Sequence, residues 1–251
     1  MAHPVVHWEL SSKNSEKLQQ FYTSLFDWHV EQQKSMDYGA VRTGGKDGID
    51  GGIFQDVNID PPYVTFYVQA DDLHASLGKA QSLGARTVVP PTPIPEAGTF
   101  TQIADPDGHL IGIIQPSAAS EESRGGQPRD AGDGHPVVHW EIGSRDAERL
   151  QQFYTDLFGW QVDFNNPMNY GTVTTGGKGG INGGIFQAAN GTPSYLTIYV
   201  QVDAVKTALA KAENLGAKTI VPPTPIPGVG VFAHFADLDG HVIGVIQDEM
   251  A

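Results

Sequence analysis

The chain has 251 residues, of which 39% are hydrophobic and 18% charged, and its 15 Lys and Arg face 29 Asp and Glu for a formal net charge of −14. This profile is typical of a folded globular protein and excludes a disordered or fibrous one, and the negative charge disfavours nucleic acids and anionic membranes as partners. The lack of cysteine excludes disulfides, thiolate metal sites and cysteine nucleophiles, so any chemistry depends on His, carboxylates, hydroxyls or a cofactor.

The first 115 residues contain the same order of elements twice, a strand and a helix followed by three strands. β-Branched and aromatic runs predict the strands, and apolar residues at helical spacing predict the helices. The first set comprises a strand at 5–10, a helix over 18–25 and strands at 28–33, 38–43 and 49–55. The second set comprises a strand at 63–68, a helix over 73–83 and strands near 87–89, 100–104 and 110–115.

The dominant feature of the sequence is an internal duplication. Residues 3–115 match residues 135–247 at a constant offset of 132, with 67 identities in 113 positions and no gap. We therefore predict two copies of one domain, at 1–115 and 135–251. Ser, Gly, Pro and charged residues without an apolar period predict an exposed linker at 116–134. Such a tandem favours a monomer with two domains related by a pseudo-twofold axis, and a homodimer of the chain is left open.

Candidate ligand-contacting residues follow from the alternation of side chains along strands. If the apolar face with Trp8 packs under the helix, His7 and Glu9 lie on the opposite face, and strand 63–68 places further polar residues in the same way. Tyr38 is added because it borders a glycine-rich hairpin, where an aromatic ring can cover a small ligand. The predicted ligand-binding set is His7, Glu9, Tyr38, Thr65, Tyr67, Gln69 and their copies His139, Glu141, Tyr170, Thr197, Tyr199, Gln201.

A His and a Glu two residues apart on a strand allow three interpretations. They are a pair of metal ligands, an acid and base pair, or a hydrogen-bonded pair that orients itself, and the spacing does not decide between them. The candidate metal ligands are His7 and Glu9 in the first copy and His139 and Glu141 in the second. This gives at most one His and one carboxylate in each half.

The other motifs give weaker support for a functional site. The glycine cluster 44–52 does not match a phosphate-binding loop, because Lys46 is followed by Asp47 rather than by Ser or Thr. His109, His241 and His234 are predicted to be surface or packing residues. His234 differs from its counterpart Gln102, and Glu96 and Ala97 differ from Gly228 and Val229, so these differences between the copies lie in one late segment.

Several of these features together resemble the vicinal oxygen chelate superfamily of glyoxalase I, bleomycin-resistance proteins and extradiol dioxygenases. They are His7, the helix that carries Phe21 and Tyr22, the Asp105–Gly108 turn and the paired order of elements. The segments 89–95 and 221–227 resemble a glyoxalase-related group within it. The resemblance covers both halves and implies an α+β fold of two glyoxalase-like domains, each made of two βαβββ modules with curved mixed sheets.

The resemblance also implies where metal ligands would stand, since metal-using glyoxalases take a His, a Glu, a His and a Glu from the first, fourth, fifth and eighth strands. His7 and His139 match the first of these. Thr65 and Thr197 stand at the fifth-strand position, Gly112 and Gly244 stand at the eighth, and the fourth strand offers no carboxylate at its centre. Loss of such ligands lowers metal affinity steeply, so we expect no cofactor and leave a divalent metal open.

We therefore predict a protein that binds a small organic molecule in concave pockets without a four-ligand metal centre, and that binds neither nucleic acid nor membrane. The first residues lack the layout of a signal peptide, which favours a cytoplasmic location. The alternative is a glyoxalase-related lyase or isomerase, or a metal-dependent oxygenase, using a reduced His and Glu site. A third interpretation is an interaction module without a small ligand.

Overall fold

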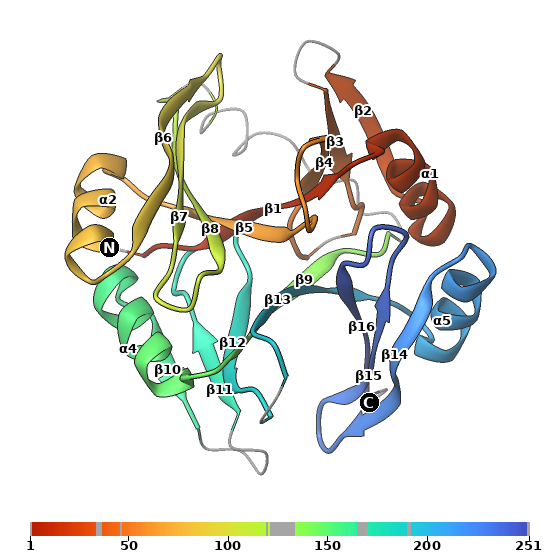
Figure 1. Ribbon diagram of the computed structural model, residues 1–251. Helices are drawn as coiled ribbons and strands as arrows, with labels where there is room; N and C mark the ends of the chain where they lie inside the picture. Colours follow the sequence, from red (N-terminus) through yellow and green to blue (C-terminus); the bar gives the residue numbers. More distant parts are fainter. Residues whose placement is uncertain are drawn as a thin grey trace. The chain divides into compact units, whose positions relative to one another are not determined.

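The computed structural model describes residues 2–33, 37–45, 47–118, 120, 134–164, 170–189 and 192–249. Within these ranges the chain forms four helices and sixteen strands (Figure 1). Of the predicted linker at 116–134, residues 119 and 121–133 lie outside the described residues.

Each sequence repeat folds into two βαβββ modules, which confirms the predicted α+β class. In the first repeat the modules are β1 (Val5–Ser12), α1 (Ser15–Phe26), β2 (His29–Gln33), β3 (Tyr38–Arg42) and β4 (Gly51–Gln55), then β5 (Val64–Gln69), α2 (Leu73–Ser82), β6 (Arg86–Ile94), β7 (Gly98–Ala104) and β8 (Leu110–Pro116). In the second they are β9 (Val137–Ser144), α4 (Ala147–Phe158), β10 (Gln161–Asp163), β11 (Gly171–Thr174) and β12 (Asn182–Gln187), then β13 (Tyr195–Gln201), α5 (Val205–Asn214), β14 (Lys218–Ile226), β15 (Gly230–Ala236) and β16 (Val242–Asp248).

Local sequence explains where the first helix of each repeat begins and ends. The side chain of Asn14 accepts a hydrogen bond from the backbone N–H of Lys17 at 3.1 Å, which satisfies one of the unpaired donors of the first turn. The helix ends at Phe26, and the next residue, Asp27, has a left-handed φ of 58°. The second repeat has Asp146 and Gly159 at these two places, so both ends follow the same rules.

The described chain divides into two compact units, and each combines modules from both repeats. Unit 1 contains the described residues of Met1–His7, Thr65–Pro128 and Trp140–Leu196, and unit 2 contains those of Trp8–Val64, Arg129–His139 and Thr197–Ala251. Unit 1 therefore pairs the second module of the first repeat with the first module of the second repeat, and unit 2 pairs the other two. The repeats and the compact units divide the chain differently, and the domain boundaries expected from the repeat stay a prediction.

Strand order within the units places the first strand of each module beside its last. In unit 1 the orders are β5-β8-β7-β6 and β9-β12-β11-β10, and in unit 2 they are β1-β4-β3-β2 and β13-β16-β15-β14. The pairs β1 with β4, β5 with β8 and β13 with β16 are parallel, whereas the pairs that follow them along the sheet are antiparallel. The sheets are therefore mixed, as predicted.

Aromatic side chains fill the core of each unit. In unit 2 the rings of Trp8 and Trp28 lie 5.1 Å apart, and in unit 1 those of Trp140 and Trp160 lie 5.1 Å apart. All four rings are at most 2% exposed. This burial confirms the expectation that the face with Trp8 packs in the core, and large buried rings contribute much of the stabilising apolar area.

The strands β6 and β14 extend beyond the predicted residues 87–89 and their copy. β6 continues from Arg86 to Ile94 through Pro90, Pro91 and Pro93, and it lies last in its strand order. Proline lacks the N–H that a central strand needs, but an edge strand tolerates it. The edge position therefore explains why a proline-rich segment forms a strand here.

Candidate functional site

Four residues of unit 1 form what we name the Tyr67 cluster, namely His7, Tyr67, Phe100 and Gln102. The ring of Tyr67 meets the ring of His7 edge-on at 5.8 Å, and the ring of Phe100 lies 6.2 Å away. Gln102 donates a hydrogen bond from Nε2 to the hydroxyl of Tyr67 at 2.9 Å. Tyr67 and Gln102 are 4% and 5% exposed and His7 is half-buried, so His7 is the most accessible polar group of the cluster.

The close approach of two strands explains how the Tyr67 ring fits here. Tyr67 on β5 pairs with Gly112 on β8, and a Cβ atom at Gly112 would lie 2.1 Å from the ring. Only glycine leaves room for the ring at this place. Gly244 has the same relation to Tyr199 in the second repeat, at 2.4 Å.

The equivalent residues of unit 2, His139, Tyr199, Phe232 and His234, form what we name the Tyr199 cluster. The hydroxyl of Tyr199 lies 2.7 Å from Nε2 of His234, and its ring lies 5.6 Å from that of His139. Desolvation by burial lowers the pKa of both histidines from 6.5 to about 4. Both rings are therefore neutral at neutral pH.

This desolvation predicts a loss of stability in acid. The folded chain keeps His139 and His234 neutral, whereas the unfolded chain protonates them below their ordinary pKa of 6.5. The free energy of unfolding should therefore fall as the pH drops from about 6.5 to about 4, where the loss is complete. Urea unfolding of wild type and His234→Gln across this range checks it, because the variant should show a shallower fall and equal slopes would contradict the prediction.

Glu9 and Tyr38, both predicted from the sequence, are brought together in unit 2. Tyr38 donates a hydrogen bond to Glu9, and burial together with this carboxylate raises the pKa of Tyr38 far above its usual value. A Cβ atom at Gly52 would lie 1.9 Å from the Tyr38 hydroxyl, so this glycine leaves space for the ring. The half-buried Glu9 therefore accepts a hydrogen bond from a half-buried tyrosine.

The second repeat surrounds its glutamate with two tyrosines in unit 1. Tyr195 donates to Glu141 at 2.9 Å, and Glu141 also accepts a hydrogen bond from Tyr170. Burial and the carboxylate raise the pKa of both tyrosines well above the usual value. Phe186 stacks on Tyr170 with ring centroids 5.8 Å apart. Tyr170 was predicted from the sequence, whereas Tyr195 was not, because it starts a strand and belongs to no motif.

The remaining predicted residues make different contacts. Thr65 and Thr197 are fully buried and donate their hydroxyls to the backbone carbonyls of Leu110 and Val242, at 2.7 and 2.6 Å. Gln201 donates to Asp248 at 2.6 Å, and Gln69 is half-buried at the end of β5. The two threonine hydroxyls therefore add a hydrogen bond between β5 and β8 and another between β13 and β16.

These residues do not fit the four-ligand metal centre that the resemblance implies. Thr65 and Thr197, at the fifth-strand position, donate their hydroxyls to backbone carbonyls. The rings of Tyr67 and Tyr199 cover the glycines at the eighth-strand position. Across the described ranges, no group of three or more His, Asp or Glu side chains is placed to hold a metal ion. No chemical step is therefore assigned to a metal.

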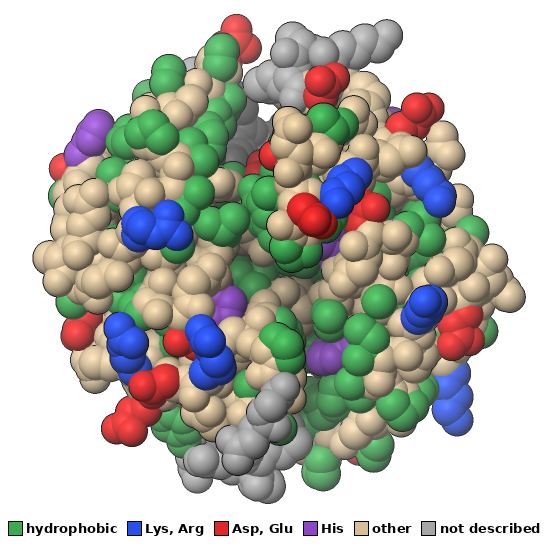
Figure 2. Space-filling model, viewed as in Figure 1, with side chains coloured by type: hydrophobic (Ala, Val, Ile, Leu, Met, Phe, Trp, Pro, Cys, Tyr) green, Lys and Arg blue, Asp and Glu red, His purple; other side chains and the backbone are tan. Residues whose placement is uncertain are grey.

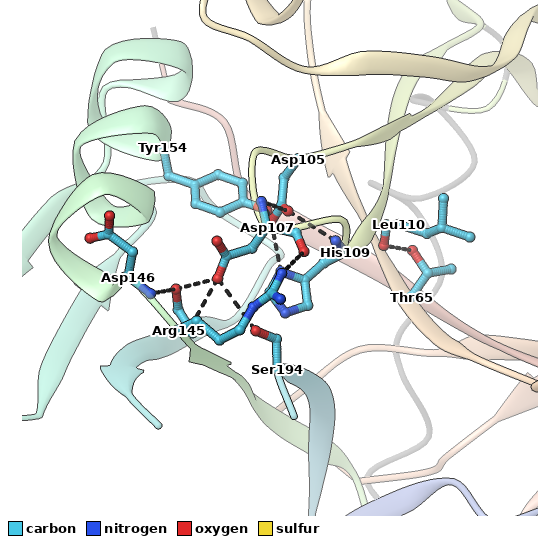
Figure 3. Close-up of polar contacts among 10 residues, drawn as sticks. Thr65, Asp105, Asp107, His109, Leu110, Arg145, Asp146, Tyr154 and Ser194 are labelled. Carbon is cyan, nitrogen blue, oxygen red and sulfur yellow. Dashed lines mark hydrogen bonds and ion pairs between the residues drawn. The ribbon is translucent and has the colours of Figure 1, made fainter. Parts of the chain in front are cut away.

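A buried polar network that was not predicted from the sequence surrounds Asp105 in unit 1 (Figure 3). Asp105 accepts hydrogen bonds from His109 Nδ1 and from the hydroxyl of Tyr154 on α4, each at 2.9 Å. Its other oxygen accepts from the backbone N–H groups of Asp107 and His109. In unit 2 Asp237 holds His241 and Tyr22 in the same way, at 2.8 and 2.7 Å. The sequence did contain a signal for this network, because its Asp, its His and its Tyr all recur in both copies.

Asp107 ties the same turn to the end of β9. It accepts hydrogen bonds from the hydroxyl of Ser144 at 2.5 Å and from the backbone N–H of Arg145 at 3.1 Å (Figure 3). Burial alone would raise the pKa of Asp107, but these hydrogen bonds outweigh it and lower the pKa. The Asp105–His109 turn therefore joins the two modules of unit 1, and its copy does so in unit 2.

Two surface hollows lie away from the predicted residues. One, of about 400 Å³ in unit 1, is lined by residues at the start of α2 and in the β6–β7 hairpin, including His74, Glu96 and Thr99. The other, of about 580 Å³ in unit 2, is lined by Lys17, Lys218 and the turn that holds Asp237. Neither contains a residue of the Tyr67 or Tyr199 cluster.

Charge is mixed on the face of the molecule that Figure 2 draws. On the face drawn in Figure 2, Lys and Arg side chains are interspersed with acidic and uncharged groups. No helix in the described part of the chain has both the length and the apolar character needed to span a bilayer.

Comparison with known proteins identifies the family. The model of the Glyoxalase/Bleomycin resistance protein/Dioxygenase superfamily matches residues 5–113 and again residues 137–245. The chain belongs to this superfamily, and both repeats are members of it.

Individual relatives are more distant. "Putative glyoxylase CFP32" of Mycobacterium bovis is 24% identical over 259 residues, which cover 95% of this chain and 92% of that protein. Among solved structures, the Mn(II)-bound glyoxalase from Novosphingobium aromaticivorans matches with a TM-score of 0.69 and 15% identity, covering 98% of this chain and 81% of that one. The 2,3-dioxygenase LapB from Pseudomonas sp. KL28 matches with a TM-score of 0.68 and 14% identity, covering 100% and 94%. These structural matches show a shared fold.

Proposed function

We propose that the chain binds small organic molecules at two sites, one at the Tyr67 cluster and one at the Tyr199 cluster, without a four-ligand metal centre. The observation that carries this proposal is the packing of Tyr67 on Gly112, and of Tyr199 on Gly244. An aromatic ring with a polar tip stands where the resemblance places a metal-binding carboxylate. Superfamily membership supports the choice of a small molecule as the partner.

The chemistry of the two clusters suits a ligand with an aromatic or other flat apolar part and at least one oxygen. Tyr67 and Phe100 offer ring surfaces, and His7 offers a half-buried imidazole. Small-molecule sites combine such apolar walls with a few polar groups that fix orientation. His139, Tyr199 and Phe232 repeat these features.

The alternative is a glyoxalase-related lyase or isomerase, or a metal-dependent oxygenase. A glyoxalase reaction needs a metal to polarise an oxygen and a basic carboxylate to move a proton. Glu9 and Glu141 are each held by tyrosine hydroxyls, which favours an orienting role over a basic one. The binding proposal therefore agrees better with the geometry.

A ligand screen tests the proposal. Compounds from a library of small aromatic acids, phenols and amides that raise the melting temperature of wild type should lose this effect in His7→Ala combined with His139→Ala. The matched control combines His29→Ala with His74→Ala, because both of these histidines are exposed. Loss of the shift in the control, or its retention in the first variant, would contradict binding at the two clusters.

A further inference from the structure

A glutamate in unit 1 is bordered by three aromatic side chains. Glu141, Tyr170, Phe186 and Tyr195, which we name the Glu141 cluster, all belong to this unit. Glu141 is 7% exposed, whereas the three aromatic residues are half-buried. The carboxylate is therefore largely removed from water, and the rings beside it are still accessible from solvent.

Hydrogen bonds and ring contacts hold the aromatic side chains at the carboxylate. The hydroxyls of Tyr195 and Tyr170 both donate to Glu141, the first at 2.9 Å. The ring of Phe186 lies 5.8 Å from that of Tyr170 and 6.0 Å from that of Tyr195. The planes of Phe186 and Tyr195 are 69° apart, so a group placed in the corner between them can contact both rings.

A glycine allows the Tyr195 ring to reach the carboxylate. A Cβ atom at Gly143 would lie 2.6 Å from this ring. The first repeat carries Ser11 at the equivalent position, and the hydroxyl of Ser11 accepts from the backbone N–H of Tyr63 at 2.8 Å. A serine side chain excludes a ring from the place that Tyr195 occupies. This arrangement of two tyrosines is therefore built into the second repeat.

The cluster carries negative charge. Burial and the carboxylate hold the pKa of both tyrosines well above its usual value, so their hydroxyls stay neutral and the charge of Glu141 is kept. Asp163 pairs with Thr172, and Thr172 pairs with Gly184. Directly paired residues share a face of the sheet, and Gly184 is the residue that the Tyr170 hydroxyl covers. The sheet face with Tyr170 therefore holds a second carboxylate.

Aromatic faces next to a desolvated carboxylate are suited to an organic cation. The face of an aromatic ring is the negative end of its quadrupole and attracts a cation that lies within about 6 Å. A carboxylate removed from water attracts a cation more strongly than an exposed one. A quaternary ammonium group fits both, because its methyl groups pack on rings and it has no N–H group that burial would leave unpaired.

We propose that the Glu141 cluster binds an organic cation of the quaternary ammonium class, with the positive group against the rings of Phe186 and Tyr195 and beside the carboxylate of Glu141. The cluster shares no residue with the Tyr67 and Tyr199 clusters, so this inference does not depend on the proposed function. It gives Glu141 a ligand-binding role that involves neither a metal ion nor proton transfer.

The test compares choline with 3,3-dimethylbutan-1-ol, its uncharged isostere, at constant pH and ionic strength. Ligand-observed NMR of the full chain follows the methyl signal that both compounds have. Wild type should bind choline at least about tenfold more tightly than the isostere, because only choline gains the cation–aromatic and carboxylate attraction. Glu141→Gln keeps an acceptor for both tyrosines but removes the charge, and it should weaken choline binding by about tenfold or more.

Two further variants make the outcome specific to this cluster. Gly143→Ser introduces the residue that the first repeat carries, and it should weaken choline binding because it displaces the Tyr195 ring. Glu148→Gln removes the same charge from an exposed position on α4 and should leave the choline affinity unchanged.

Several results would overturn the inference. They are equal affinity of wild type for choline and its isostere, an unchanged choline affinity in Glu141→Gln, and an equal loss in Glu148→Gln. If Glu141→Gln did not fold, Gly143→Ser would decide, and full choline affinity in that variant would overturn the inference. No binding of choline to wild type would also overturn it, and would leave the proposed function standing.

Discussion

Replacing Asp105 with Ala is expected to lower the free energy of unfolding by about 3 to 5 kcal/mol. Asp105 is 5% exposed, and its carboxylate accepts hydrogen bonds from the side chains of His109 and Tyr154 and from two backbone N–H groups. Its removal leaves these buried donors without a partner and cuts the link between the Asp105 turn and α4. Chemical denaturation of the full chain measures the change.

Matched variants identify the cause of this loss. Asp237→Ala removes the equivalent carboxylate in unit 2 and should cost a similar amount. Tyr154→Phe removes one donor only and should cost about 1 kcal/mol. Asp107→Ala alters a more exposed carboxylate in the same turn and should cost less than Asp105→Ala. If Asp105→Ala were no more costly than Asp107→Ala, the buried network would not be the link between the modules.

Replacing Gly112 with Glu is expected to destabilise the fold by about 3 kcal/mol or more, because a side chain there collides with the Tyr67 ring. The change puts back the carboxylate that the resemblance places in the eighth strand, but the ring occupies its space. The variant should therefore unfold at lower denaturant concentration and gain no metal affinity. Denaturant unfolding and calorimetric metal titration measure the two effects.

A second substitution separates the collision from other effects of a new charge. Tyr67→Ala combined with Gly112→Glu removes the ring, and the pair should be more stable than the sum of the two single changes predicts. Gly78→Ala is the control, because a Cβ atom at this helical position meets nothing within 4 Å. It should be neutral or slightly stabilising. A Gly112→Glu protein as stable as wild type would show that the ring does not block this position.

The duplication made much of the fold predictable. Two copies with 67 identities in 113 positions repeat the same strand and helix patterns, so each assignment is supported twice. The core position of Trp8 followed from the alternation of side chains along its strand. The length of β6 could not be predicted, because prolines argue against a strand until its place at a sheet edge is known.

Contacts between residues far apart along the chain could not be predicted from the sequence. The Asp105 turn was predicted as a turn, but its bond to Tyr154 joins residues 49 positions apart in different repeats. Local patterns report which residues share a face and do not report which modules pack together. The pairing of modules from different repeats in each unit could therefore come only from the structure.

The candidate site was predicted in part for the same reason. Alternation along β1 and β5 placed His7 and Tyr67 on one face, and their rings do lie within contact distance. Alternation could not show that the Thr65 hydroxyl is bonded to a backbone carbonyl or that Gln102 reaches Tyr67 from β7. Those contacts depend on the register of neighbouring strands, which alternation along a single strand does not specify.

The most direct test of the central claim, that the two clusters bind small molecules without a metal centre, is metal analysis of the full chain purified without chelator. The same measurement is made on His7→Ala combined with His139→Ala. We expect no stoichiometric metal that depends on these two histidines. Stoichiometric Mn, Fe, Ni or Zn in wild type that disappears in the double variant would contradict it.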